Sequence, residues 1–144
     1  MKYVVMISHG EFAPGLRSAV FMMTGPKDEV LCTNLRADMS ADEFQENFRA
    51  LVAPISPAQD EVILLCDILG GSPMTKALEV LSEKDLLDKA IVLTGMNMPM
   101  AMTAVIMKDA MDDKAALTAA IISESQGAIA EFKTVSEESS DDDI

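Results

Sequence analysis

Residues 62–73 read VILLCDILGGSP, an unbroken apolar run followed by an aspartate, a glycine pair and a serine-proline step. A continuous apolar run is typical of a parallel strand that is covered on both faces. Ser72-Pro73 is a helix-start signal, because a serine side chain can cap free amides and proline is tolerated in the first turn. The stretch therefore predicts a buried strand that turns directly into a helix, with Ser72 as the N-cap residue.

The same alternation continues on both sides of this stretch. Further apolar runs predict strands at residues 3–7, 30–32 and 90–93. Apolar spacing and start and stop residues predict helices near residues 16–23, 40–53, 72–81, 99–107 and 112–127. This order predicts an α/β fold, an open parallel sheet with helices on both faces. Right-handed crossovers and the chain length favour the flavodoxin-like strand order 2-1-3-4.

The C-terminal part of the chain is harder to interpret. Residues 128–135 could extend the last helix or form a fifth strand, and the alternation of Ala130 and Phe132 with Glu131 and Lys133 favours the strand. Residues 136–144 hold five acidic residues and no basic one, which predicts a solvated, disordered tail. We therefore expect one domain over residues 1–135 and an acidic tail over residues 136–144.

Composition and charge limit the possible functions. The 144 residues suffice for one domain, and 49% of them are hydrophobic, as in a packed globular protein. The net charge of −13 argues against nucleic acid as a partner and suggests partners with basic surfaces. No apolar run is long enough for a signal peptide or a membrane span, so we expect a cytoplasmic protein. Cys32 and Cys66 lie in apolar runs and are expected to be small buried residues in a reducing compartment.

The predicted sheet brings polar residues together at one edge. In a 2-1-3-4 sheet the strand order reverses between strands 1 and 3, and ligands bind outside the carboxyl ends of those strands. Strand 1 ends at His9-Gly10, and strand 3 ends at Asp67, before Gly70-Gly71-Ser72. We therefore expect these residues to share one crevice.

The residue types in this crevice favour phosphoryl transfer. His9, the only histidine, can act as a nucleophile near neutral pH. Asp67 can accept a hydrogen bond from one ring N–H and so fix the tautomer, as in a catalytic triad. The turn at Gly70-Gly71-Ser72 points backbone amides and a helix dipole at the crevice, which suits an anion, and Gly10 lets another molecule approach.

Other features of the sequence bear on cofactors. There is no nucleotide-binding G-x-x-x-x-G-K-[ST] motif and no magnesium-binding pattern, so we expect no cofactor and a phosphorylated protein as the phosphoryl donor. Met96, Met98, Met100 and Met102 alternate, and thioethers can bind Cu(I). Apolar packing is the favoured interpretation, because Pro99 should break the alternation and scatter the sulfur atoms.

Three motifs carry a family resemblance. They are Ile7-Ser8-His9-Gly10, Cys66-Asp67-Ile68-Leu69-Gly70-Gly71-Ser72-Pro73 and Gly95-Met96-Asn97-Met98-Pro99-Met100. Over about residues 1–135 the chain resembles the enzyme IIA domain of the mannose/fructose/sorbose class of the bacterial phosphoenolpyruvate-dependent sugar phosphotransferase system.

The resemblance implies roles for these residues. His9 would carry the phosphoryl group, Asp67 would orient it, and Ser72 would face the phosphate with Gly10, Gly70 and Gly71. Asn97, Met98 and Pro99 would border the site and contact partners.

The resemblance also implies partners. The phosphoryl group would come from the histidine-containing carrier protein HPr and pass to enzyme IIB, which serves the membrane subunits IIC and IID. A homodimer that exchanges a C-terminal strand would explain residues 128–135. No IIB domain follows the tail in this sequence, so IIB is expected on a separate polypeptide.

Three alternatives remain open from the sequence. The phosphotransfer subunit that feeds dihydroxyacetone kinase shares the N-terminal histidine, although Gly-Gly-Ser-Pro is not expected there. A receiver-like regulatory domain would be phosphorylated on Asp67, but it needs acidic residues at the end of strand 1, where this chain has Ser8-His9. A hydrolase would use Ser72, His9 and Asp67, although Gly-Gly-Ser-Pro is not the G-x-S-x-G elbow.

Overall fold

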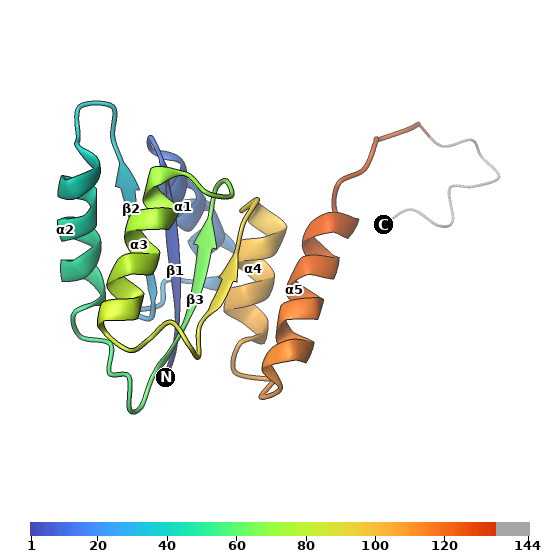
Figure 1. The fold of residues 1–144 in the computed structure, drawn as a ribbon. Helices are drawn as coiled ribbons and strands as arrows, with labels where there is room; N and C mark the ends of the chain where they lie inside the picture. Colours follow the sequence, from blue (N-terminus) through green and yellow to red (C-terminus); the bar gives the residue numbers. More distant parts are fainter. Residues whose placement is uncertain (135–144) are drawn as a thin grey trace.

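The strands form one parallel sheet with the predicted order β2-β1-β3-β4 (Figure 1). In this computed structural model, residues 1–134 are described, so the predicted tail at residues 136–144 lies outside the described part. The bounds of the strands are β1 Lys2–His9, β2 Val30–Leu35, β3 Glu61–Cys66 and β4 Ile91–Leu93.

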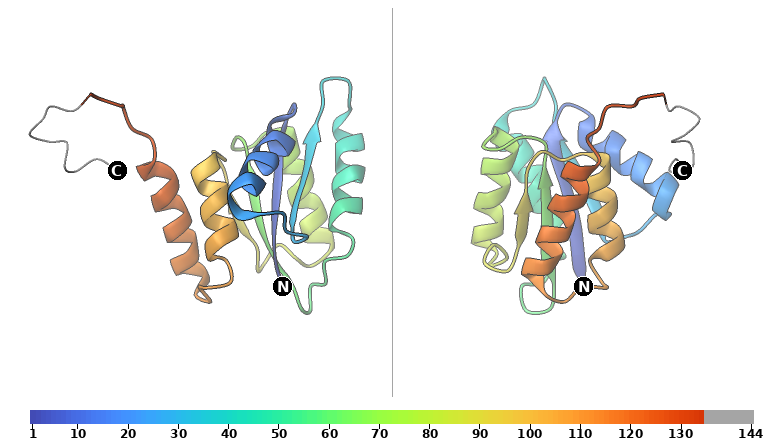
Figure 2. Two further views of the ribbon diagram at one scale, coloured as in Figure 1. Left: turned by 180° about the vertical axis from the view of Figure 1, so that it is seen from behind. Right: turned by 90° about the vertical axis from the view of Figure 1, so that its right-hand side faces the viewer.

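Helices cover both faces of the sheet, as predicted (Figures 1 and 2). One face carries α1 (Phe12–Thr24), α4 (Met98–Met107) and α5 (Lys114–Gly127). The opposite face carries α2 (Ala41–Val52) and α3 (Ser72–Glu83). Among residues 1–134, no helix has the length and apolarity needed to cross a membrane.

Two apolar clusters fill the space between the sheet and its helices. Side chains alternate across a strand, so Val4 and Met6 of β1 pack towards α1 and α4, whereas Val5 and Ile7 pack towards α2 and α3. Both sets are fully buried, which explains the continuous apolar run in the sequence.

The alternating methionines belong to the core on the α1 and α4 side. Met96 and Met100 are buried, and Met98 and Met102 pack against the same apolar cluster, which is the arrangement that apolar packing requires. The two cysteines are unpaired, with Cys66 buried on one face of the sheet and Cys32 half-buried on the other.

Helices α2 and α5 each begin with a side-chain cap. Ser40 accepts a hydrogen bond from the Glu43 amide, and Asp113 accepts from the first-turn amides of α5. The prediction for Ser72 is wrong by one residue. Gly71 is the N-cap of α3, its carbonyl accepts from the Thr75 amide at 3.0 Å, and Ser72 is already helical with an exposed side chain. The reason is that Gly71 itself adopts the extended N-cap conformation, so the hydroxyl one residue later lies past the capping position.

The predicted fifth strand is absent from the described residues of the single chain. Residues 128–134 have no regular secondary structure and lead away from the end of α5 (Figure 2). Ile129 and Phe132 are 79% and 88% exposed. A strand needs a hydrogen-bonding neighbour, and among residues 1–134 none lies beside this segment.

Candidate functional site

The candidate site lies where β1 and β3 end side by side. Ile7 pairs with Cys66 in the parallel register, so His9 and Asp67 both follow the paired residues at the same edge of the sheet. The Asp67 Oδ2 atom lies 2.8 Å from His9 Nδ1 and accepts the His9 backbone amide at 2.9 Å. Its Oδ1 atom accepts the Ile68 amide at 2.9 Å. The structure therefore brings the predicted histidine and aspartate into direct contact.

Asp67 is held as a carboxylate. Burial by itself would raise the pKa of Asp67, but hydrogen bonds from the His9 amide, the His9 ring and the Ile68 amide lower the pKa below its usual value. An ionised carboxylate only accepts hydrogen bonds, so the ring nitrogen Nδ1 must be the donor. In the neutral ring the lone pair is then on Nε2, and the His9 side chain is 45% exposed.

Gly71 sets the distance between His9 and the start of α3. A Cβ atom at position 71 would lie 2.8 Å from His9 Cε1 and 3.4 Å from Nε2. The first of these distances is shorter than a side-chain carbon tolerates, so the glycine is required for the ring to occupy its position. The open nitrogen Nε2 thus lies against the N-terminal end of a helix.

The amides before and at the start of α3 give this end of the helix its electrostatic character. The first amides of an α-helix have no partner within the helix and, with the helix dipole, favour an anion. The Gly70 amide donates only to the Met74 sulfur, at 3.3 Å, and a thioether is a weak acceptor. Of the three predicted phosphate-facing residues Gly70, Gly71 and Ser72, Gly71 lies against the His9 ring.

The turn that follows His9 contains Gly10 and is fixed by Ser8 and Asn34, of which Asn34 was not predicted from the sequence as a site residue. Gly10 has φ +56°, and its amide donates to the Leu35 carbonyl at 2.8 Å. Ser8 is fully buried, and its Oγ accepts the Ala13 amide at 2.7 Å at the start of α1. Asn34, at the end of β2, donates to the Gly10 carbonyl. The available signal was a polar residue two positions after the apolar run at residues 30–32.

The Asn97-Met98-Pro99 segment is tied to the same edge of the sheet. The Met96 amide donates to the Cys66 carbonyl at 3.0 Å, immediately before Asp67. Asn97 then caps α4, with its Oδ1 accepting the Met100 amide at 2.8 Å. The helix begins at Met98, one residue before the predicted Pro99.

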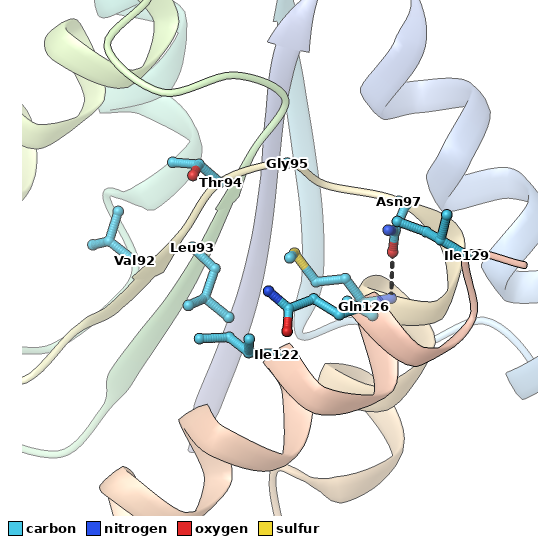
Figure 3. A pocket seen from close by; sticks show the side chains of 10 residues that line it. Val92, Leu93, Thr94, Gly95, Asn97, Ile122, Gln126 and Ile129 are labelled. Carbon is cyan, nitrogen blue, oxygen red and sulfur yellow. Dashed lines mark hydrogen bonds between the residues drawn. The ribbon is translucent and has the colours of Figure 1, made fainter.

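A pocket of about 390 Å³ lies beside this region and not at the histidine (Figure 3). Asn97 and Ile129 line it together with Leu93 of β4 and Gln126 of α5, whereas neither His9 nor Asp67 does. The pocket is therefore separate from the His9–Asp67 contact, and it marks an unfilled space next to the outer strand β4.

Ser72 does not complete a hydrolase triad. Among residues 1–134, the ring of His9 has a hydrogen-bonding partner in Asp67 but none in the Ser72 hydroxyl. The two oxygens of Asp67 already accept from three N–H groups, which suits an orienting carboxylate better than a phosphorylated one.

Comparison with known proteins identifies the family. A sequence model of the EIIA-man family, described as the PTS system fructose IIA component, matches residues 3–122. The chain belongs to this family. It is 24% identical over 106 residues to the PTS system fructose-specific EIIA component of Bacillus subtilis (strain 168). That alignment covers 74% of this chain and 70% of the relative.

Solved structures of the family share the fold. The phosphotransferase system component EIIA from Streptococcus agalactiae superimposes with a TM-score of 0.78 at 26% identity, covering 91% of this chain and 97% of that one. The mannose/sorbose specific IIA subunit from Enterococcus faecalis gives a TM-score of 0.79 at 20% identity, over 94% and 98% of the two chains. The chain is thus a IIA component of the mannose/fructose class of the sugar phosphotransferase system.

Proposed function

We propose that the protein is a phosphocarrier that accepts a phosphoryl group from phosphorylated HPr on His9 Nε2 and passes it to enzyme IIB. The observation that carries this proposal is the contact between His9 Nδ1 and Asp67, because it leaves Nε2 as the exposed nucleophile. Membership of the family supports the phosphotransfer role.

The geometry around His9 supports the following transfer step. The lone pair on Nε2 attacks the phosphorus of the donor phosphohistidine, and the electrons of the breaking P–N bond return to the donor imidazole. The His9 ring then carries a phosphoryl group on Nε2 and a proton on Nδ1, so it bears a positive charge that the Asp67 carboxylate stabilises. Transfer to IIB is the reverse attack by an acceptor side chain.

The start of α3 is the proposed binding place of the phosphoryl oxygens. Phosphoryl transfer depends mainly on positioning and on donors aimed at the transferred oxygens. The amides of Gly70, Gly71 and Ser72 would supply such donors beside Nε2. The space around Gly10 is open, since a Cβ atom there would meet nothing within 4 Å, which leaves room for the carrier to approach the turn after His9.

A protein donor also fits the surface around His9. Ile68 and Leu69 follow Asp67 directly and are 54% and 77% exposed. The side chains of Ile68 and His9 both lie against Gly71. A Cβ atom on Gly71 would be 3.3 Å from Ile68 Cδ1 and 2.8 Å from His9 Cε1. Apolar side chains in such a place are suited to being covered by a partner protein.

The assembly and location belong to the same proposal. The free thiols of Cys32 and Cys66 suit the reducing cytoplasm, where IIB would serve the membrane subunits IIC and IID. A homodimer would form by exchange of residues 128–135, with the segment added to the open edge of β4 in the partner. The exposed side chains of Ile129 and Phe132 and the space beside β4 support this arrangement.

The test is a phosphorylation assay with intact-mass detection. The protein is incubated with phosphoenolpyruvate, enzyme I and HPr, and compared with His9→Ala. We expect one added phosphate that is labile in acid, stable in base and absent from His9→Ala. An unmodified wild type in the presence of HPr that is itself phosphorylated would refute the proposal, and a base-labile adduct would favour phosphorylation of Asp67. Addition of IIB should then discharge the phosphate.

A further inference from the structure

The turn that carries His9 is held from the opposite face of the sheet by Asn34. Ser8 pairs with Asn34 in the parallel register of β1 and β2, so the two side chains point to the same face, towards α1. The ring of His9 points to the other face, against Gly71 at the start of α3. The backbone between these contacts is a single turn.

Asn34 makes two hydrogen bonds to that turn. Its Nδ2 atom donates to the Gly10 carbonyl at 2.7 Å and to the Glu11 carboxylate at 2.9 Å. The residue is only 8% exposed. A buried side-chain amide that donates two hydrogen bonds fixes the backbone that accepts them. If the donor were lost, the accepting oxygens would be left without a partner where water has little access.

The start of α1 depends on these same contacts. Glu11 occupies the N-cap position of α1 but makes no capping hydrogen bond, since its carboxylate is engaged by Asn34. The Ser8 hydroxyl accepts the Ala13 amide in its place. Ser8 and Asn34 therefore hold both ends of the turn that contains Gly10, the residue with φ +56°.

We infer that Asn34 is a positioning residue for phosphoryl transfer at His9. It touches neither the ring nor Asp67, but it fixes the backbone from which the ring reaches Asp67 and Gly71. Without it the Nδ1–Asp67 contact is no longer enforced, and Nε2 loses its fixed direction of attack. This inference rests on the proposed function of His9.

Two variants test the inference. Asn34→Asp keeps the shape but replaces the donor by an acceptor, and Asn34→Leu keeps the approximate volume without a charge. Asn47→Leu is the matched control, because Asn47 is exposed on α2. His9 is the only histidine, so labelling with ¹⁵N-histidine gives an NMR spectrum of this ring alone.

We expect the wild type and the control to show a single tautomer with the proton on Nδ1, and the Asn34 variants to show a mixture of tautomers. The rate constant of phosphorylation at saturating HPr should fall about tenfold or more in the Asn34 variants, while the HPr concentration at half-maximal rate stays unchanged.

The outcomes separate the two proposals. A folded Asn34→Leu with the wild-type tautomer and the wild-type rate overturns the role of Asn34. Unfolding of both variants also overturns it, because Asn34 would then serve the stability of the fold alone. If the wild type takes no phosphate, the proposed function fails, and the tautomer comparison still decides whether Asn34 positions the ring.

Discussion

His9 is fixed by contacts on three sides, although nearly half of its side chain is exposed. Asp67 binds both its backbone amide and its Nδ1 atom, Gly71 lies against the ring, and Asn34 holds the following turn. An exposed lysine or histidine on a helix has no such restraint. The conformational entropy of the ring is thus lost on folding and not at the moment of transfer.

Gly71→Ala tests the close approach of α3 to the ring. The added methyl group would lie 2.8 Å from His9 Cε1, so the ring must move away from its position beside the helix. We expect the phosphorylation rate to fall by about tenfold to a hundredfold. Gly15→Ala is the control, since a Cβ there meets nothing within 4 Å. Equal rates for the two variants, measured by quenched-flow mass spectrometry, would show that the contact has no role.

Asp67→Asn tests how the site contributes to stability. The folded-state pKa of Asp67 lies below its ordinary value, mainly because hydrogen bonds to the carboxylate outweigh the cost of burial. Its stabilising effect is therefore present above the ordinary pKa of 3.8 and is lost as the pH falls through the lowered value. Near neutral pH the variant should be less stable by about 1–2 kcal/mol.

Urea unfolding at a series of pH values measures this difference. The difference in the free energy of unfolding between the wild type and Asp67→Asn should become smaller as the pH falls below 3.8. Asp38→Asn serves as the control, because the Asp38 side chain is 88% exposed. If this difference in unfolding free energy stays constant down to the pH at which the protein unfolds in acid, the result would contradict the lowered pKa of Asp67.

At the scale of elements, α2 shows how a local signal determines a helix boundary. Ser40→Ala removes the side-chain oxygen that accepts the Glu43 amide, and we expect a loss of about 1 kcal/mol in the free energy of unfolding. Ser82→Ala, in the exposed part of α3, should have little effect or a slight gain from helix propensity. Chemical denaturation of both variants gives the comparison, and equal stabilities would mean that Ser40 does not cap the helix.

The elements were predictable because their signals are local or periodic. Continuous apolar runs marked the strands, and the order of strands and helices then led to the sheet order 2-1-3-4. The placement of His9 opposite Asp67 followed from that order, because adjacent parallel strands end at one edge.

The features that the sequence did not reveal depend on backbone conformation and on distant contacts. Serine is a residue type that is favoured at the N-cap, yet Gly71 takes the N-cap position of α3 in place of Ser72. Glycine can also adopt the extended N-cap conformation. Asn34 is 24 residues from Gly10, and only the register of β1 and β2 brings them together. The segment 128–134 alternates like a strand but has no strand neighbour in the part of the chain that the structure describes.

At the scale of the whole molecule, that segment tests the proposed dimer. We expect the wild type to sediment as a dimer and Phe132→Asp to raise the dimer dissociation constant by roughly tenfold or more, because a charge would enter an apolar contact. Met22→Asp is the control, since Met22 is 87% exposed on α1, close to the 88% of Phe132. Analytical ultracentrifugation decides, and a monomeric wild type at high concentration would refute strand exchange.

The pairing of β1 with β3 has a consequence for how the protein matures on the ribosome. His9 and Asp67 are 58 positions apart, which corresponds to roughly 3–12 s of synthesis at about 5–20 residues per second. During that interval the nascent chain exposes a complete β1 that can pair only with β2. A chain stalled before codon 67 therefore displays the histidine without the carboxylate that orients it, so competence for phosphoryl transfer is acquired only after residue 67 has been added.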